Sequence, residues 1–157
     1  SANQEAIEQA AKEDAKIIHG NIPIIYTNPR YEGVGIRFRQ QLNENSKLLC
    51  WNHVFPEMNH NELLGWNGGN DSFGVIFLRN KTDNDRNQYR MEISKEIISD
   101  KTDVVIDLFS KGKNNIERTF YLILATDWIS VYLAEEYKVD SIEIKVIDRL
   151  KKALSEK

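Results

Sequence analysis

The sequence is poor in cysteine and lacks any long apolar run. Cys50 is the only cysteine among 157 residues, so the chain cannot form an internal disulfide or a cysteine-based zinc site. Because Cys50 lies in an apolar run, we expect a buried structural thiol in a reduced, cytoplasmic setting, not a nucleophile. No apolar stretch reaches the roughly 18 residues that a membrane span needs, and residues 1–16 lack the apolar segment of a signal peptide.

The chain also has fewer basic than acidic residues. The chain has 21 Lys and Arg against 24 Asp and Glu, a formal net charge of −3 that argues against nucleic-acid binding. The basic run of Arg149, Lys151 and Lys152 is short and flanked by Asp148 and Glu156, which is typical of a solvated helix face. With 41% hydrophobic residues, a chain of this length is predicted to form one globular domain.

Histidine occurs only three times, and the three residues are too dispersed to give a recognisable metal-ligand spacing. His19 ends a predicted helix and His53 lies in an apolar strand, so both are interpreted as structural. His60 stands with Glu57 and Glu62 in a polar turn, which leaves a metal site there as a minor alternative. We expect no metal and no organic cofactor.

Short apolar runs rich in β-forming residues alternate with helical patterns along the chain. Strands are predicted at residues 22–26, 48–55, 72–78 and 104–109. Helices are predicted at residues 3–19, 33–45, 82–100, 116–136 and 142–154. In the helix over residues 82–100, Tyr89, Ile93 and Ile97 form the predicted inner stripe. This alternation favours an α/β fold with a parallel sheet covered on both faces, whose ligands bind beyond the carboxyl ends of the strands.

Two polar stretches carry candidate chemistry, residues 43–45 and residues 55–62. Glu44 alone would be interpreted as a solvated helix carboxylate, and His60 alone as a hydrogen-bonded structural histidine. Together they fit aldose–ketose isomerisation. A carboxylate can carry the C2 proton to C1 through an enediol, and a histidine can open the sugar ring, because its pKa lies near neutrality. A lysine can assist electrostatically, and this route needs no cofactor.

These same stretches resemble a known family. Residues 55–66 differ little from Phe-Pro-Glu-Leu-Asn-His-Asn-Glu-Ile-Val-Gly-Trp, a motif of the bifunctional phosphoglucose/phosphomannose isomerases. Residues 33–47 are similar to the glycine-led helix of that family, which ends in Asn-Glu-Asn-Ala-Lys. Residues 22–26 and 147–151 look like the first strand and the last helix of its second sugar isomerase (SIS) domain.

The resemblance implies a SIS-type three-layer α/β/α sandwich around a five-stranded parallel sheet. Residues 1–20 would be a linker helix, and residues 21–157 the C-terminal SIS domain. Glu44 matches the catalytic base of the family, His60 its ring-opening histidine and Lys151 its late lysine. The family's histidine reaches the active site of a neighbouring subunit, which implies a homodimer. The implied reaction converts glucose 6-phosphate to fructose 6-phosphate, with mannose 6-phosphate as a further candidate substrate.

Several family features are missing from this chain. The phosphate-binding Ser/Thr loop and the active-site arginine belong to an N-terminal SIS domain, so no substrate-binding residue is assigned, and we expect the isolated chain to be inactive. Ile144 stands where the family tends to have a small hydroxyl residue near its selectivity position, and Gly35-Ile36 replaces Ala-Tyr. Two alternatives stay open: a non-catalytic sugar-phosphate-binding or regulatory SIS module, and a dimerisation domain.

Overall fold

A computed structural model describes the backbone of residues 2–156 and the side chains of residues 4–156. The helices are α1 (Ala2–Ile18), α2 (Glu32–Glu44), α3 (Glu62–Gly65), α4 (Asp85–Ser99), α5 (Asn115–Glu136) and α6 (Lys145–Ser155). The strands are β1 (Ile22–Thr27), β2 (Trp51–Val54), β3 (Phe73–Arg79) and β4 (Val105–Phe109). Short 3-10 turns are η1 (Pro29–Tyr31), η2 (Glu57–Asn59) and η3 (Trp66–Gly68).

The strands form one parallel sheet in the order β2-β1-β3-β4, which confirms the predicted α/β class. The sheet has four strands within residues 2–156, not the five that the family resemblance implies. After β4 the described chain continues as α5 and α6, joined by residues 137–144. That connection lies outside the sheet, and Ile142 within it is 82% exposed.

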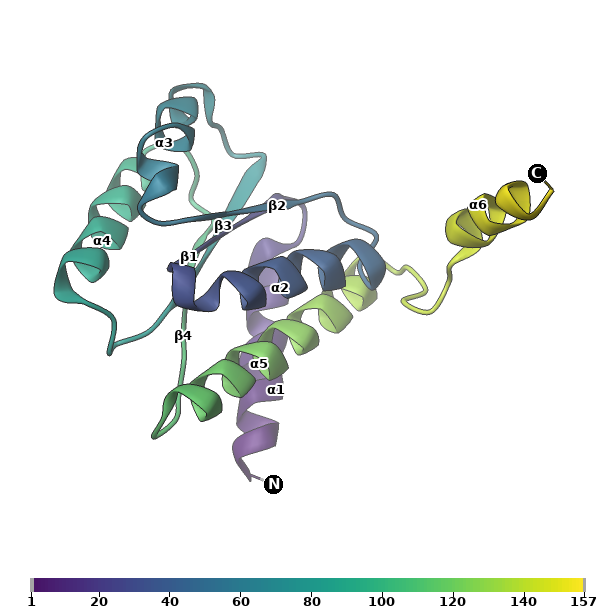
Figure 1. The fold of residues 1–157 in the computed structure, drawn as a ribbon, viewed down its shortest axis with the longest axis horizontal. Coiled ribbons are helices and arrows are strands. Elements are labelled where there is room, and N and C mark those ends of the chain that lie inside the picture. Colours follow the sequence, from purple (N-terminus) through teal and green to yellow (C-terminus); the bar gives the residue numbers. More distant parts are fainter. Residues whose placement is uncertain (1, 157) are drawn as a thin grey trace.

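Helices cover both faces of the sheet, which gives the three-layer sandwich (Figure 1). On one face α1, α2 and α5 pack together and bury apolar residues such as Phe38 against Ile25 of β1. On the other face α4 and the segment from η2 to η3 bury Met58 and Met91 against Ile24 of β1. Successive residues of a strand point to opposite faces, so the central strand β1 contributes to both cores.

Helix α1 is packed into the first of these cores. Ala11, Ala15 and Ile18 are buried there, and α1 lies against α5. Hydrogen bonds tie α1 and the turn after it to α5 and its C-cap: Tyr132 donates to Glu8 Oε1 at 2.6 Å, and the Gly20 amide donates to the Tyr137 hydroxyl at 2.7 Å. The N-terminal helix and the sheet are therefore one packed body.

The predicted inner stripe of α4 is wrong. Tyr89, Ile93 and Ile97 are 68%, 39% and 40% exposed, and the buried stripe is instead Met91, Ser94 and Ile98. Both stripes have helical spacing, so periodicity alone does not separate them. The orientation agrees with ion pairs to the sheet: Arg79 of β3 pairs with Glu92 at 2.6 Å, and Lys95 pairs with Asp107 of β4.

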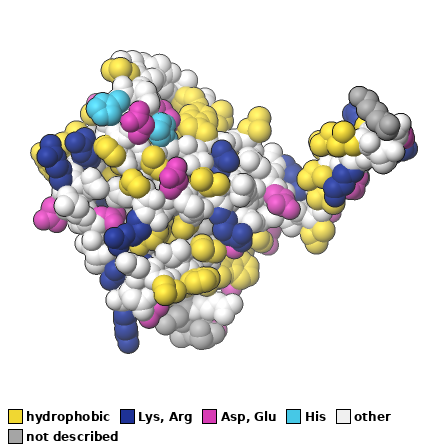
Figure 2. All heavy atoms as spheres, in the orientation of Figure 1, with side chains coloured by type: hydrophobic (Ala, Val, Ile, Leu, Met, Phe, Trp, Pro, Cys, Tyr) yellow, Lys and Arg dark blue, Asp and Glu magenta, His cyan; other side chains and the backbone are white. Residues whose placement is uncertain are grey.

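Helix α6 stands clear of the rest of the molecule (Figure 1). Its apolar residues Ile147, Leu150 and Leu154 recur at helical spacing but are 45%, 59% and 65% exposed, and no residue of α6 is buried. Figure 2 shows apolar and charged side chains on this projecting arm. No helix among residues 2–156 has the length and apolar character that crossing a membrane requires.

Candidate active site

Glu44 is the last residue of α2. The helix lies close to the sheet because Gly35 has no side chain: a Cβ there would come within 3.2 Å of Thr27 Cγ2. Phe38 and Leu42 are buried against the sheet, while Glu44 at the end of the helix is exposed to solvent. Among the described side chains no ion pair involves Glu44. Its carboxylate is therefore accessible and is not sealed in a structural contact.

A cavity of about 900 Å³ lies beside Glu44. It is lined by α2, by Lys47 and Leu49 after that helix, and by residues 143–147, where α6 begins. Lys47 holds these segments together: its Nζ donates to the Glu44 carbonyl at 2.6 Å and to the Glu143 carbonyl at 2.9 Å. Ile144, the residue singled out by comparison with the family, is also part of this wall.

Lys151 is an exposed residue of α6, four positions beyond Ile147 of the cavity wall. Residues four apart in a helix lie on the same face, about 6 Å apart along the axis. Lys151 therefore lies on the helix that closes one side of the cavity, but it is not itself part of the wall.

His60 lies at the other end of β2 from Glu44. It is the exposed C-cap residue of η2, and its backbone amide donates to the Glu57 carbonyl at 2.9 Å. Glu44 precedes β2 in the chain, whereas His60 follows it, and none of the cavities described among residues 4–156 is lined by His60. In one copy of the chain, the cavity beside Glu44 is therefore not shared with His60.

The alternative of a metal site at His60 has no support from the geometry. No three His, Cys, Asp or Glu side chains among the described residues are grouped so as to hold a metal ion. Glu57 accepts a hydrogen bond from Asn61 at 3.3 Å, while Glu62 accepts one from Tyr26 at 2.5 Å. The carboxylates on either side of His60 thus have different partners and do not converge on its imidazole.

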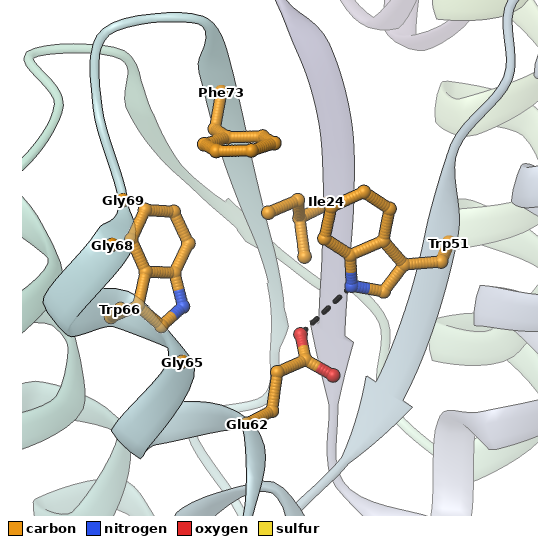
Figure 3. Close-up of a pocket in the computed structure, with 8 residues that line it drawn as sticks. All are labelled: Ile24, Trp51, Glu62, Gly65, Trp66, Gly68, Gly69 and Phe73. Carbon is orange, nitrogen blue, oxygen red and sulfur yellow. Dashed lines mark hydrogen bonds between the residues drawn. The ribbon is translucent and has the colours of Figure 1, made fainter.

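A second, smaller cavity was not predicted from the sequence (Figure 3). It measures about 180 Å³ and lies between the starts of β1, β2 and β3 and the segment from α3 to η3. Trp51, Trp66, Phe73 and Ile24 surround it, with Glu62 at one side. The aromatic residues come from separate segments of the chain, so only their abundance around residues 51–73 could have drawn attention to them.

The family of the chain follows from its sequence profile. The profile of the family described as "Bacterial phospho-glucose isomerase C-terminal SIS domain" matches residues 7–154, nearly the whole chain. The chain belongs to this family. The predicted resemblance is thereby confirmed, and the sandwich described above is a SIS domain of the phosphoglucose/phosphomannose isomerase family.

Longer proteins are similar to this C-terminal SIS domain. It is 36% identical over 154 residues to the bifunctional phosphoglucose/phosphomannose isomerase of Aquifex aeolicus, covering 97% of this chain and 48% of that protein. The enzyme of the same name from Caldicellulosiruptor bescii is 37% identical over 139 residues, covering 86% and 41%. The SIS domain thus spans less than half the length of these curated relatives.

Solved structures confirm the fold. A glucose-6-phosphate isomerase like protein from Thermus thermophilus superposes with a TM-score of 0.69 at 19% identity, covering 90% of the SIS domain and 46% of that chain. The C-terminal domain of glucosamine-fructose-6-phosphate aminotransferase from Francisella tularensis gives 0.72 at 10% identity, covering 89% and 43%. At such low identity these likenesses concern the SIS architecture alone.

Proposed function

We propose that the chain is the C-terminal catalytic domain of a cytoplasmic aldose–ketose isomerase that interconverts glucose 6-phosphate and fructose 6-phosphate. Mannose 6-phosphate is included as a further candidate substrate. The observation that carries the proposal is the exposed carboxylate of Glu44 in the wall of a cavity of about 900 Å³. That cavity lies in a domain whose relatives are named bifunctional phosphoglucose/phosphomannose isomerases.

In this proposal Glu44 acts as the base that moves a proton between two carbon atoms. Once the sugar ring is open, its carboxylate removes the C2 proton of the aldose, the electrons of that C–H bond form the C1=C2 double bond, and the aldehyde oxygen takes up a proton to give the enediol. The same carboxyl group then returns the proton to C1 while the C2 hydroxyl gives up its own proton, which leaves a hydroxyl group on C1 and a ketone at C2. The exposed position of Glu44 allows a sugar to approach it. Lys47 Nζ donates to the Glu44 backbone carbonyl at 2.6 Å, which fixes the last turn of the helix.

His60 is proposed to open the ring, and Lys151 to assist electrostatically. His60 follows β2 and Glu44 precedes it, so the proposed site takes His60 from a second copy in a homodimer. Lys151 lies on α6, one turn beyond the cavity wall, and α6 projects from the domain (Figure 1). An N-terminal SIS domain, for which the greater length of the relatives leaves room, would supply the phosphate site.

Replacing Glu44 by Gln in the full-length protein tests the base. Loss of a general base typically lowers turnover by about 10²–10⁴-fold. We therefore expect kcat for fructose 6-phosphate to fall by that order, with the fold unchanged because Glu44 is exposed. With glucose 6-phosphate deuterated at C2 as the substrate, exchange of that deuterium with solvent should be lost in parallel, as followed by NMR.

Glu32→Gln is the matched control, since Glu32 is an exposed carboxylate at the opposite end of the same helix. That variant should keep its turnover within about twofold, because surface changes away from a site are usually mild. Normal turnover of Glu44→Gln would show that the base is misassigned. Tight binding of glucose 6-phosphate without turnover by the unmodified protein would favour the non-catalytic module.

A further inference from the structure

The smaller cavity is walled by aromatic rings (Figure 3). Phe73 of β3 lies with its ring centroid 5.8 Å from that of Trp51 of β2 and 5.8 Å from that of Trp66 of η3, both in edge-to-face geometry. The two indoles flank the space from opposite sides, and Ile24 of β1 forms its back. Trp66 and Ile24 are buried, whereas Trp51 is 38% exposed, so the cavity opens to solvent beside Trp51.

Glu62 places a carboxylate in this aromatic enclosure. Its Oε1 atom accepts hydrogen bonds from the Tyr26 hydroxyl at 2.5 Å and from Trp51 Nε1 at 2.9 Å. The Tyr26 hydroxyl in turn accepts from Trp66 Nε1 at 2.9 Å. These contacts fix the carboxylate against the same indoles that line the cavity.

The negative charge of Glu62 is not compensated within the described part of the chain. Its hydrogen-bond donors are a phenol and an indole, and both are neutral. Burial, and then the hydrogen bond to Glu62, raise the pKa of Tyr26 far above its usual range, which keeps this phenol protonated. No Lys, Arg or His side chain among residues 4–156 forms an ion pair with Glu62.

An aromatic enclosure with one fixed carboxylate selects a particular kind of ligand. The faces of Trp and Phe rings attract cations, most strongly those that are weakly hydrated and can leave water. A hydrated metal ion would need several oxygen ligands, and this cavity offers a single carboxylate. We propose that the cavity bounded by Trp51, Trp66, Phe73 and Glu62 binds an organic cation through its ammonium group.

This site is separate from the proposed isomerase centre. The two cavities share no lining residue. The aromatic cavity belongs to the core that lies under α4, whereas Glu44 ends α2, which packs on the opposite face of the sheet. The cation site therefore stands on its own observations, and a failed isomerase assay would not affect it.

Choline is the probe, and 3,3-dimethyl-1-butanol is its neutral match, because the two differ mainly in the charged nitrogen. The indole N–H signals of Trp51, Trp66 and Trp128 can be followed in ¹⁵N-labelled protein by NMR titration. Choline should shift the Trp51 and Trp66 signals and leave that of Trp128, which packs with Tyr132 on α5, in place. The neutral alcohol should shift none of them.

Glu62→Gln removes the charge and keeps an oxygen that can accept from Tyr26 and Trp51. Since ion and cation–π contacts in a partly enclosed site each contribute on the order of 1–2 kcal/mol, choline should bind about tenfold more weakly. Glu57 is an exposed carboxylate of the same segment, so the control variant Glu57→Gln should bind choline as the unmodified chain does. Should Glu62→Gln fail to give a dispersed spectrum, Trp51→Leu provides the second test, with a similar loss expected.

The cation could be a free molecule or a Lys or Arg side chain of another copy, and solution mass separates these two sources. If choline lowers the mass of an oligomer, the cation is a side chain of another copy. If the mass does not change while choline is bound, the cation is a free molecule. Either result supports the proposed site. Equal shifts with choline and the neutral alcohol overturn the proposal. It is also overturned if choline shifts neither Trp51 nor Trp66.

Discussion

Asp14 illustrates how one partly buried carboxylate can limit stability. It lies on α1, and burial, followed by the neighbouring charge of Glu13, raises its pKa from 3.8 to about 6. A raised pKa means that the folded chain holds this proton more tightly than the unfolded chain does. The folded state is therefore favoured at low pH, and its contribution is lost as the pH rises from about 4 through about 6.

Asp14→Asn should remove this penalty. We expect the variant to be more stable than the unmodified chain at pH 7 by about 1 kcal/mol, a value reduced from the full shift because the group is partly exposed. The difference should shrink towards zero near pH 4, where the aspartate is largely protonated in the folded state and close to half protonated in the unfolded state. Urea unfolding between pH 4 and pH 7 measures it. A stability difference that stays constant across this range would contradict the assigned cause.

Single residues also show what the sequence could and could not predict. Cys50 was predicted to be a buried structural thiol; it is half-buried against the first core, and burial raises its pKa to about 11. The strand at residues 22–26 followed from its apolar run, and β1 covers it. The buried stripe of α4 was predicted wrongly, because Tyr89 begins a wholly apolar series with helical spacing, whereas the stripe that packs on the sheet begins at Met91 and includes the polar Ser94.

The candidate site was predicted in parts. Glu44 is predicted as a site residue from its resemblance to a family motif, but the cavity beside it depends on the course of residues 143–147, which no local pattern gives. The aromatic cavity unites β2, η3 and β3, whose contact exists only in the folded chain. The strand predicted at residues 48–55 already separates Glu44 from His60, and β2 keeps that order, but a single sequence carries no direct information on how two copies assemble.

At the scale of elements, α6 has an apolar face that the rest of the described chain does not cover. Leu150 and Leu154 are 59% and 65% exposed, although they lie on one stripe of a helix whose other positions are mostly charged or polar. An amphipathic helix normally buries such a stripe. Within the proposed enzyme, the surface that receives it would be an N-terminal domain or a second copy.

Leu150→Asp tests this idea by comparing two contexts. In the isolated chain the change should alter the free energy of unfolding by no more than about 0.5 kcal/mol, because the side chain is exposed. In the full-length protein it should lower stability or activity clearly, since a charge would then be buried in an interface. Lys152→Asp is the control on the same helix. A large loss in the isolated chain would show that α6 packs within the domain.

At the scale of the whole molecule, the position of β2 between Glu44 and His60 predicts sharing of sites between copies. Glu44→Gln and His60→Asn should each be inactive alone. When both are co-expressed as full-length chains, random pairing gives mixed dimers with one intact site, so about a quarter of normal activity should return. Activity assays on the co-purified mixture measure this.

Two controls define the outcome of the mixing experiment. Glu44→Gln expressed alone under the same conditions should recover no activity. Mass spectrometry should show that the co-purified mixture contains both variants. If both variants are present in one dimer and no activity returns, His60 does not act across subunits. The homodimeric arrangement of the site would then be wrong, although the cavity at Glu44 would remain.

The ion network around Arg79 has a consequence for how the protein avoids aggregation. Arg79 is buried on β3 and pairs with Glu92 and with Asp107, and Asp107 on the edge strand β4 also pairs with Lys95. Charged side chains on an edge strand discourage a foreign strand from adding to the open backbone, and a very short edge strand has the same effect. Asp107 lies on one edge strand of the sheet, and the other edge strand, β2, has only four residues. Both edges therefore disfavour the addition of a strand from another chain.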